Sequence, residues 1–226
     1  MKVKVIVFDL DDTLFDELDY VRSGLLHVSE YLATILDATA EQLYQELLKS
    51  LAIARSHVFD RVLKIHNSWT EKLISECVTR YRTHTPNIEL SHVTKRLISS
   101  LAREYSLYIV TDGHADVQRM KLQTLGLSNN AAITDCYATY ALGEDYAKPS
   151  PKCFELICER EQCNPVHVVY IADNPDKDFI GIKPLGFRTI RVMQGQHSDK
   201  QVELDADAEV SVRDLVSACE LLEPLH

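Results

Sequence analysis

The stretch VKVIVFDLDDT, residues Val3–Thr13, is the part of the sequence that most constrains the fold. The residues from Val5 to Phe8 are β-branched or aromatic, which is typical of a strand buried on both faces of a helix-covered parallel sheet. Asp9 and Asp11 follow at the carboxyl end, where open α/β sheets bind their ligands. Carboxylates two residues apart can converge on one hard cation, but Asp-rich turns also end strands and cap helices. This stretch alone leaves both interpretations open.

Four helical segments follow this first strand with no strand between them. Apolar residues recur at helical spacing in residues 21–35, 40–54, 58–65 and 70–82. Such a group of helices can bury its own apolar faces and act as a lid. The sequence therefore predicts a helical cap domain of residues 15–86, inserted into a core of residues 1–14 and 87–226.

From Ser91 onward, helices and strands alternate, which is the pattern of a doubly wound sheet. Helices are predicted at 92–103, 115–125, 153–163, 179–185 and 212–222. Strands are predicted at 107–111, 133–137, 167–172, 188–192 and near Ala208, with a loop at 141–151. The expected fold class is α/β, a doubly wound parallel sheet with an inserted α-helical bundle.

Composition restricts the partners of this chain. Its 226 residues are 46% apolar and carry a formal net charge of -10, with 24 basic and 34 acidic residues and no basic run. Duplex nucleic acid and anionic membranes are therefore not expected as partners. A small anionic substrate is compatible, because one metal ion and one lysine can reverse the local field.

The cysteines and the hydropathy pattern indicate the compartment. The six cysteines include no Cys-x-x-Cys pair, so we expect reduced thiols packed as small apolar groups. Lys2 and Lys4 interrupt the N-terminal apolar run, which does not resemble a secretory signal. No stretch predicts a membrane span. We therefore expect a cytoplasmic protein.

Three further polar clusters each follow a predicted buried strand. They are Thr111-Asp112-Gly113, the loop residue Lys148, and the acidic run from 173 to 178. Each alone is typical of an ordinary turn or solvated loop. Parallel strands place their carboxyl ends at one edge, so four such clusters are expected to meet there.

The order of these motifs resembles the haloacid dehalogenase (HAD) superfamily, most of whose members are magnesium-dependent phosphatases. The matching residues are Asp9, Asp11 and Thr13, then Thr111, then Lys148, then Asp173 with Asp178. The match spans nearly the whole chain, and the one departure is Ala172, where the family usually has Gly. Members with an insertion between the first two motifs carry a helical cap there, in agreement with the four helices.

The resemblance implies a role for each acidic motif residue. Asp9 would be the nucleophile that forms an aspartyl-phosphate. Asp11 would protonate the leaving alkoxide and then activate water; a dehalogenase, which releases halide, would need no such group. Mg²⁺ would be held by the Asp9 carboxylate, the backbone carbonyl region of Asp11, and Asp173. Asp178 would orient metal-bound waters or Lys148.

The remaining motif residues would bind phosphate. Thr111, the amides of Asp112 and Gly113, and Lys148 would contact the phosphoryl oxygens. Outside the motifs, His114 is interpreted as a helix-start residue. Tyr20, Arg22 and Arg55 are candidates for substrate contact from the cap.

The sequence thus predicts a magnesium-dependent phosphomonoesterase acting on a small phosphorylated metabolite through an aspartyl-phosphate. Nucleoside monophosphates and sugar phosphates are the leading substrate classes. Two alternatives stay open: a phosphomutase that uses the same intermediate, and a non-catalytic scaffold that binds a partner protein. The sequence does not distinguish the leaving group or the oligomeric state.

Overall fold

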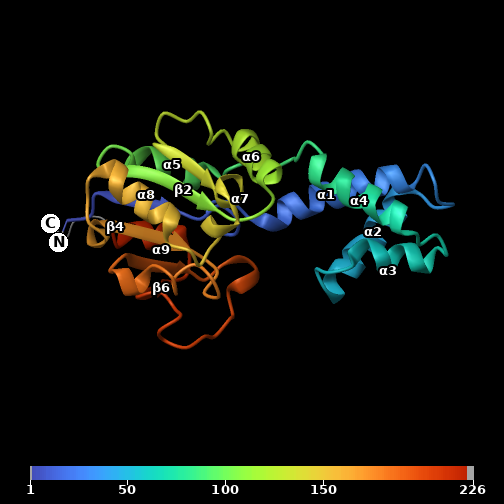
Figure 1. Cartoon of the computed structure of the whole chain (residues 1–226). Coiled ribbons are helices and arrows are strands. Elements are labelled where there is room, and N and C mark those ends of the chain that lie inside the picture. The colour runs from blue at the N-terminus through green and yellow to red at the C-terminus, as the bar shows by residue number, and fades with distance from the viewer. Residues whose placement is uncertain (1, 223–226) are drawn as a thin grey trace. The chain divides into compact units, whose positions relative to one another are not determined.

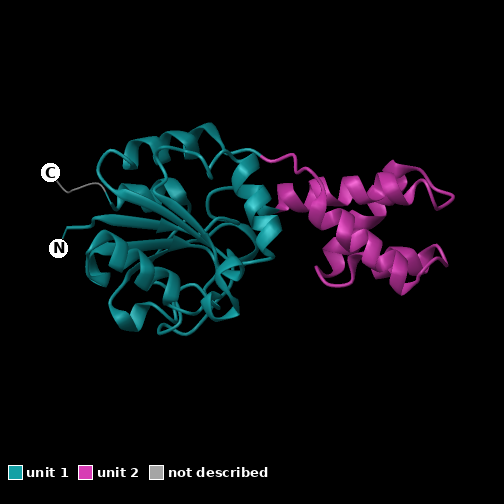
Figure 2. Ribbon diagram, turned by 45° about the horizontal axis from the view of Figure 1, so that its top comes forward, with its two compact units in different colours: residues 1–17, 89–226 teal, residues 18–88 magenta. Residues whose placement is uncertain are grey.

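The computed structural model describes residues 2–222, and the chain divides into two compact units (Figure 2). Unit 1 comprises Met1–Glu17 and Glu89–His226, and unit 2 comprises Leu18–Ile88. The expected boundaries, after residues 14 and 86, lie three and two residues earlier in the sequence. Unit 2 is thus one continuous segment inserted near the start of unit 1.

Unit 1 contains a parallel sheet (Figure 1). In the described residues its six strands lie in the order β3-β2-β1-β4-β5-β6, and every neighbouring pair is parallel. The strands are β1 (Val5–Phe8), β2 (Ser106–Thr111), β3 (Asp135–Ala138), β4 (Val168–Ala172), β5 (Arg188–Val192) and β6 (Val210–Val212). The predicted α/β fold with a doubly wound parallel sheet is confirmed.

Helices cover both sides of this sheet (Figure 2). One face, which includes Val7 and Tyr170, packs against Phe154 and Ile157 of α8 and against the segment that contains Phe179. The helices of this unit are α5 (His92–Leu101), α6 (Ala115–Thr124), α7 (Thr139–Leu142), α8 (Lys152–Glu161) and α9 (Leu215–Glu220). Burial on both faces explains why the central strands are apolar at every position.

Three predictions in unit 1 need correction. The expected helix 179–185 forms only a 3-10 turn at Lys183–Leu185, because Pro184 lacks the amide that a continuing helix requires. The expected loop 141–151 overlaps the short helix α7. The expected helix 212–222 begins later, because Val212 is still the last residue of β6. α9 begins after Asp214, whose side chain caps the helix by accepting from the Ser217 amide at 2.9 Å.

Unit 2 is a bundle of four helices, as the apolar spacing predicts. They are α1 (Glu17–Leu32), α2 (Ala40–Ile53), α3 (Val58–Ile65) and α4 (Glu71–Thr83). The first residue of α1, Glu17, still belongs to unit 1. Each contributes buried apolar side chains to one cluster, for example Val28, Leu47, Val62 and Cys77. The unit therefore has a core of its own.

The start of α2 is fixed by a capping box. The Thr39 hydroxyl accepts from the Gln42 amide at 3.2 Å, and the Gln42 side chain accepts from the Thr39 amide at 2.9 Å. These two bonds satisfy backbone donors that the helix leaves without partners.

Thr39→Ala is expected to lower the free energy of unfolding of unit 2 by about 1 kcal/mol, because one capping acceptor is lost. Urea denaturation followed by circular dichroism measures this change. Thr79→Ala is the matched control, since Thr79 lies on the exposed side of α4 and its hydroxyl donates to the Ser75 carbonyl of the same helix, and its change should stay within about 0.5 kcal/mol. Equal losses for both variants would contradict the capping argument.

No helix within residues 2–222 combines the length and the apolar composition required to cross a membrane.

Candidate active site

The sheet order brings the polar clusters to one edge. Strand β1 lies between β2 and β4, so the chain runs outward through β2 and β3 and then returns to the other side of β1. Asp9 directly follows β1, and its amide donates to the Ile171 carbonyl of β4 at 2.9 Å. Asp173 directly follows β4. Both carboxylates therefore lie where the strand order reverses, the usual position of ligand sites in open α/β sheets.

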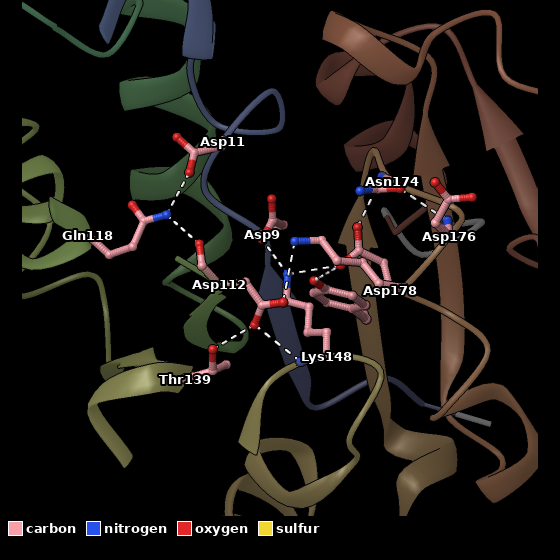
Figure 3. Close-up of polar contacts among 11 residues, drawn as sticks. Asp9, Asp11, Asp112, Gln118, Thr139, Lys148, Asn174, Asp176 and Asp178 are labelled. Atoms are coloured by element: carbon pink, nitrogen blue, oxygen red, sulfur yellow. Dashed lines mark hydrogen bonds and ion pairs between the residues drawn. The ribbon is translucent and has the colours of Figure 1, made fainter. Parts of the chain in front are cut away.

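Lys148 lies at the centre of this cluster (Figure 3). Its side chain is 1% exposed, and its ammonium group donates to Asp9 and, at 2.9 Å, to Asp178. Burial acts to lower the pKa of Lys148, but the carboxylates of Asp178 and Asp9 outweigh burial and raise this pKa. Asp178 also accepts from the Tyr170 hydroxyl at 2.9 Å and from the Asn174 amide at 3.0 Å. A fixed positive charge is therefore held beside Asp9.

The carboxylates outnumber the cations at this position. Burial raises the pKa of Asp9 to about 7, although Lys148 opposes this effect. Burial also raises the pKa of Asp173 to about 9, and the neighbouring carboxylates of Asp9, Asp178 and Asp12 add to the rise. A divalent cation at Asp9 and Asp173 would supply the missing positive charge.

The donor set fits magnesium. Within residues 2–222, no group of three His, Cys, Asp or Glu side chains has the arrangement of a metal site. The Asp9 and Asp173 carboxylates are the candidate ligands, and a backbone oxygen and water would complete the coordination of a cation. Mg²⁺ usually keeps several waters and binds through one or two carboxylates.

Asp11 lies in the same loop, but its carboxylate contacts α6. One oxygen accepts from the Lys121 ammonium at 2.6 Å, and the other accepts from the Gln118 amide at 2.8 Å. Figure 3 shows the Asp11 side chain directed toward Gln118. A contribution of Asp11 to cation binding would consequently come from its backbone carbonyl.

The sequence predicts a role only for the backbone amide of Asp112. In the structure, the Asp112 side chain also takes part in the site. Its carboxylate accepts from the Thr139 hydroxyl at 2.6 Å, from the Lys148 amide at 3.2 Å and from the Lys177 ammonium at 3.3 Å. Burial opposes ionisation, but Lys148 and Lys177 together lower the pKa of Asp112. Asp112 therefore joins the second, third and fourth motifs.

The turn after β2 brings Thr111 and Gly113 to the same edge. Thr111 is 1% exposed at the end of the strand. Gly113 has φ of +133°, and a Cβ built there would lie 2.8 Å from the Gln118 amide nitrogen. A side chain at position 113 would therefore be strained and would displace Gln118.

The loop after β5 holds the first motif from the opposite side. Gln194 donates its side-chain amide to the carbonyls of Asp12 and Thr13 at 2.9 and 3.1 Å. The Asp12 carboxylate accepts from the backbone amides of Glu17 and Gln196 at 2.9 and 3.0 Å. Gly195 packs so closely that a Cβ there would lie 2.1 Å from the Asp12 Cγ. These contacts, which we call the Asp12 clamp, fix the loop that carries Asp9 and Asp11.

Gln118, Lys121, Thr139 and Lys177 take part in this site, although sequence reasoning did not identify them. The signal for the first two was present in α6. Gln118 and Lys121 fall on the helix face of Val117 and Leu122, and all four are buried. A lysine and a glutamine on the apolar face of an amphipathic helix require buried polar partners.

The candidates in unit 2 differ in exposure. Tyr20 is 3% exposed, its ring contacts Tyr81 with centroids 5.6 Å apart, and its hydroxyl donates to the Tyr81 carbonyl. It is therefore a packing residue, and its prediction as a substrate contact is wrong. Arg22 is exposed and lies 3.7 Å from Asp19, and Arg55 is exposed.

His114 is exposed and precedes α6 as its N-cap residue, which agrees with its interpretation as a helix-start residue.

Known proteins resemble this chain over nearly its full length. Residues 6–192 match the family model of the haloacid dehalogenase-like hydrolases. The glyceraldehyde 3-phosphate phosphatase of Methanocaldococcus jannaschii is 26% identical, over 95% of this chain and 96% of the relative. The phosphoserine phosphatase of Thermus thermophilus is 24% identical, over 94% and 96%.

A similar fold is found in a solved structure, the magnesium-bound form of the putative HAD-hydrolase YfnB from Bacillus subtilis. It is 21% identical, with a TM-score of 0.69 over 99% of this chain and all of that chain. The family match, the curated relatives and the fold agree with the motif order. The chain belongs to the haloacid dehalogenase-like hydrolase family, as a member of the phosphatase type.

Proposed function

We propose that this enzyme is a magnesium-dependent phosphomonoesterase that acts through an aspartyl-phosphate on Asp9. The observation that carries the proposal is the buried contact between Asp9 and Lys148 at the strand-order reversal, beside Asp173. A carboxylate that attacks phosphorus needs a fixed geometry and compensation for the negative charge of its target. Lys148 supplies charge, and the Asp12 clamp supplies fixed geometry.

The proposed reaction has two steps. In the first, an Asp9 carboxylate oxygen forms a bond to phosphorus, the bond from phosphorus to the ester oxygen breaks, and Asp11 donates a proton to the departing alkoxide. In the second, Asp11 accepts a proton from water as that water attacks phosphorus. The bond to Asp9 then breaks and phosphate leaves. One residue can serve both steps because the covalent intermediate separates them in time.

The other polar residues would bind and orient. Lys148, the Thr111 hydroxyl and the backbone amides of Asp112 and Gly113 would contact the phosphoryl oxygens. Asp178 holds Lys148 in place through the hydrogen bond at 2.9 Å. Asp9 and Asp173 would hold Mg²⁺, which would supply positive charge that neutralises the phosphoryl group and reduces its repulsion of the Asp9 nucleophile.

The proposed substrate is a small phosphorylated metabolite. The relatives described above are named for glyceraldehyde 3-phosphate and phosphoserine. On that basis we place sugar phosphates and similar small esters ahead of nucleoside monophosphates. We also propose unit 2 as the cap domain, because its insertion between β1 and β2 is the cap position of the family.

Phosphate release from a panel of phosphorylated metabolites, measured with Mg²⁺, tests this function. The panel should contain sugar phosphates, phosphoserine, nucleoside monophosphates and 4-nitrophenyl phosphate. A phosphomutase would instead isomerise a phosphosugar with little phosphate release. A non-catalytic scaffold would turn over none of the panel, and that result would refute the proposal.

Removal of divalent metal is expected to abolish hydrolysis of 4-nitrophenyl phosphate, and added Mg²⁺ is expected to restore it. Ca²⁺ should restore little, because its larger and looser coordination shell places the Asp9 carboxylate differently. The measurement is phosphatase activity after treatment with EDTA and gel filtration, followed by titration with each metal. Full activity after exhaustive chelation would contradict the metal assignment.

A further inference from the structure

Lys121 is a buried lysine that the proposed reaction does not use. Its side chain is 3% exposed, and its ammonium group lies 2.6 Å from Asp11 and 3.9 Å from Glu17. Taking an ammonium group out of water is unfavourable unless close, well-oriented partners compensate. The other cation of α6, Arg119, is exposed. Of these two cations, Lys121 is the one that is buried, and it is buried against Asp11.

Gln118 lies one turn earlier on the same face of α6. Its side-chain amide donates to Asp11 at 2.8 Å and to the Asp112 carbonyl at 2.5 Å. The two Asp11 oxygens are thus held by two residues of one helix, Oδ1 by Lys121 and Oδ2 by Gln118. Two contacts on different oxygens restrict rotation of a carboxylate far more than one contact does.

The Gln118 carbonyl oxygen shows that this arrangement carries an energetic cost. In the described part of the chain, this oxygen is buried and accepts no hydrogen bond. An unsatisfied buried acceptor lowers stability, and such groups in a folded protein call for an explanation. Orientation of Asp11 and of the turn at Asp112 by the amide nitrogen supplies one.

We propose that Lys121 and Gln118 are positioning residues that set the orientation of the Asp11 carboxylate for its proton transfers. This inference rests on the proposed function, in which Asp11 protonates the leaving group. Neither residue touches the phosphoryl group. Both act through Asp11, so their removal should impair only the steps that depend on Asp11.

The leaving group provides the test. An alkyl phosphate releases a strongly basic alkoxide that requires a proton, whereas 4-nitrophenyl phosphate releases a weakly basic phenolate that does not. The value of kcat/KM covers the steps up to leaving-group departure and excludes hydrolysis of the intermediate. The two substrates are 4-nitrophenyl phosphate and the alkyl phosphate of the panel that the wild-type enzyme hydrolyses fastest.

Lys121→Met removes the ammonium group and keeps much of the length of the side chain. It should lower kcat/KM for the alkyl ester by about 10- to 100-fold and for 4-nitrophenyl phosphate by no more than about 3-fold. Lys121→Arg should recover part of the loss. In an Asp11→Asn background, Lys121→Met should cause no further loss, because residues that act as a unit are not additive.

Arg119→Met is the matched control, since it removes an exposed cation from the same helix. Arg119 pairs with the exposed Asp116 at 2.9 Å. Both kcat/KM values should equal those of the wild-type enzyme. Gln118→Met gives a second measurement if Lys121→Met does not fold, and the same selective loss on the alkyl ester is expected.

Equal losses on both esters, or additive losses with Asp11→Asn, would overturn the inference and assign α6 a purely structural contact. A wild-type enzyme that hydrolyses neither ester would instead refute the proposed function.

Discussion

Asp9→Asn is expected to reduce turnover of every substrate by about 10⁴-fold or more, since the amide is nearly isosteric with the carboxylate but a very poor nucleophile. The fold should be retained. Asp9 accepts from Lys148, and an amide oxygen at this position can still accept from the ammonium group. The variant should therefore keep the melting behaviour of the wild-type protein while losing the covalent step.

Rapid-quench mass spectrometry of the wild-type enzyme with substrate identifies the intermediate directly. A phosphoryl adduct should map to Asp9 and should be absent from Asp9→Asn. Asp145→Asn is the matched control, because this carboxylate is exposed and pairs with Lys152 at the surface. An adduct on another residue, or appreciable turnover by Asp9→Asn, would exclude Asp9 as the nucleophile.

Lys148→Met should impair both activity and stability. Loss of the ammonium group removes the buried positive charge beside the phosphoryl site, which should lower kcat by about 10²- to 10³-fold for all substrates alike. The same change leaves the Asp9 and Asp178 carboxylates buried without their shared cation. Breaking a buried pair in this way costs about 3 kcal/mol of unfolding free energy.

A second substitution separates these two effects. Asp178→Asn in the Lys148→Met background removes one of the carboxylates left without a cation, while its side-chain oxygen can still accept from the Asn174 amide. The double variant should recover much of the lost stability in urea denaturation and none of the lost activity. Recovery of both would mean that Lys148 only balances charge in the fold.

The central strands could be predicted because no polar residue interrupts their apolar pattern. β1 and β4 are buried at every position, so each reads as a continuous apolar run. The edge strands were less well placed. β3 is half-buried throughout, and two of the three residues of β6 are exposed. Strands at the edge of a sheet bury less and carry a weaker pattern.

The motif residues could be identified from chain order, because parallel strands bring their carboxyl ends together wherever the helices lie. The partners on α6 could not be identified in this way. Their place on the apolar face of α6 indicates that they need buried partners, but chain order does not show which turn of the helix faces Asp11. The prediction that Tyr20 contacts substrate was wrong for a different reason. A tyrosine in the predicted lid suggested substrate contact, whereas its ring is 3% exposed and packs against Tyr81.

The Asp12 clamp has a consequence for the order in which a nascent chain becomes active. The loop that carries Asp9 and Asp11 is synthesised well before its clamp partner Gln194, which is 182 residues away from Asp12. Unit 2, a continuous segment with its own core, needs no residue beyond Ile88 to complete that core. A nascent chain that ends at Phe187 already contains every motif but lacks the clamp and β5. Synthesis thus delivers the motif residues before the segment that holds the first motif in place.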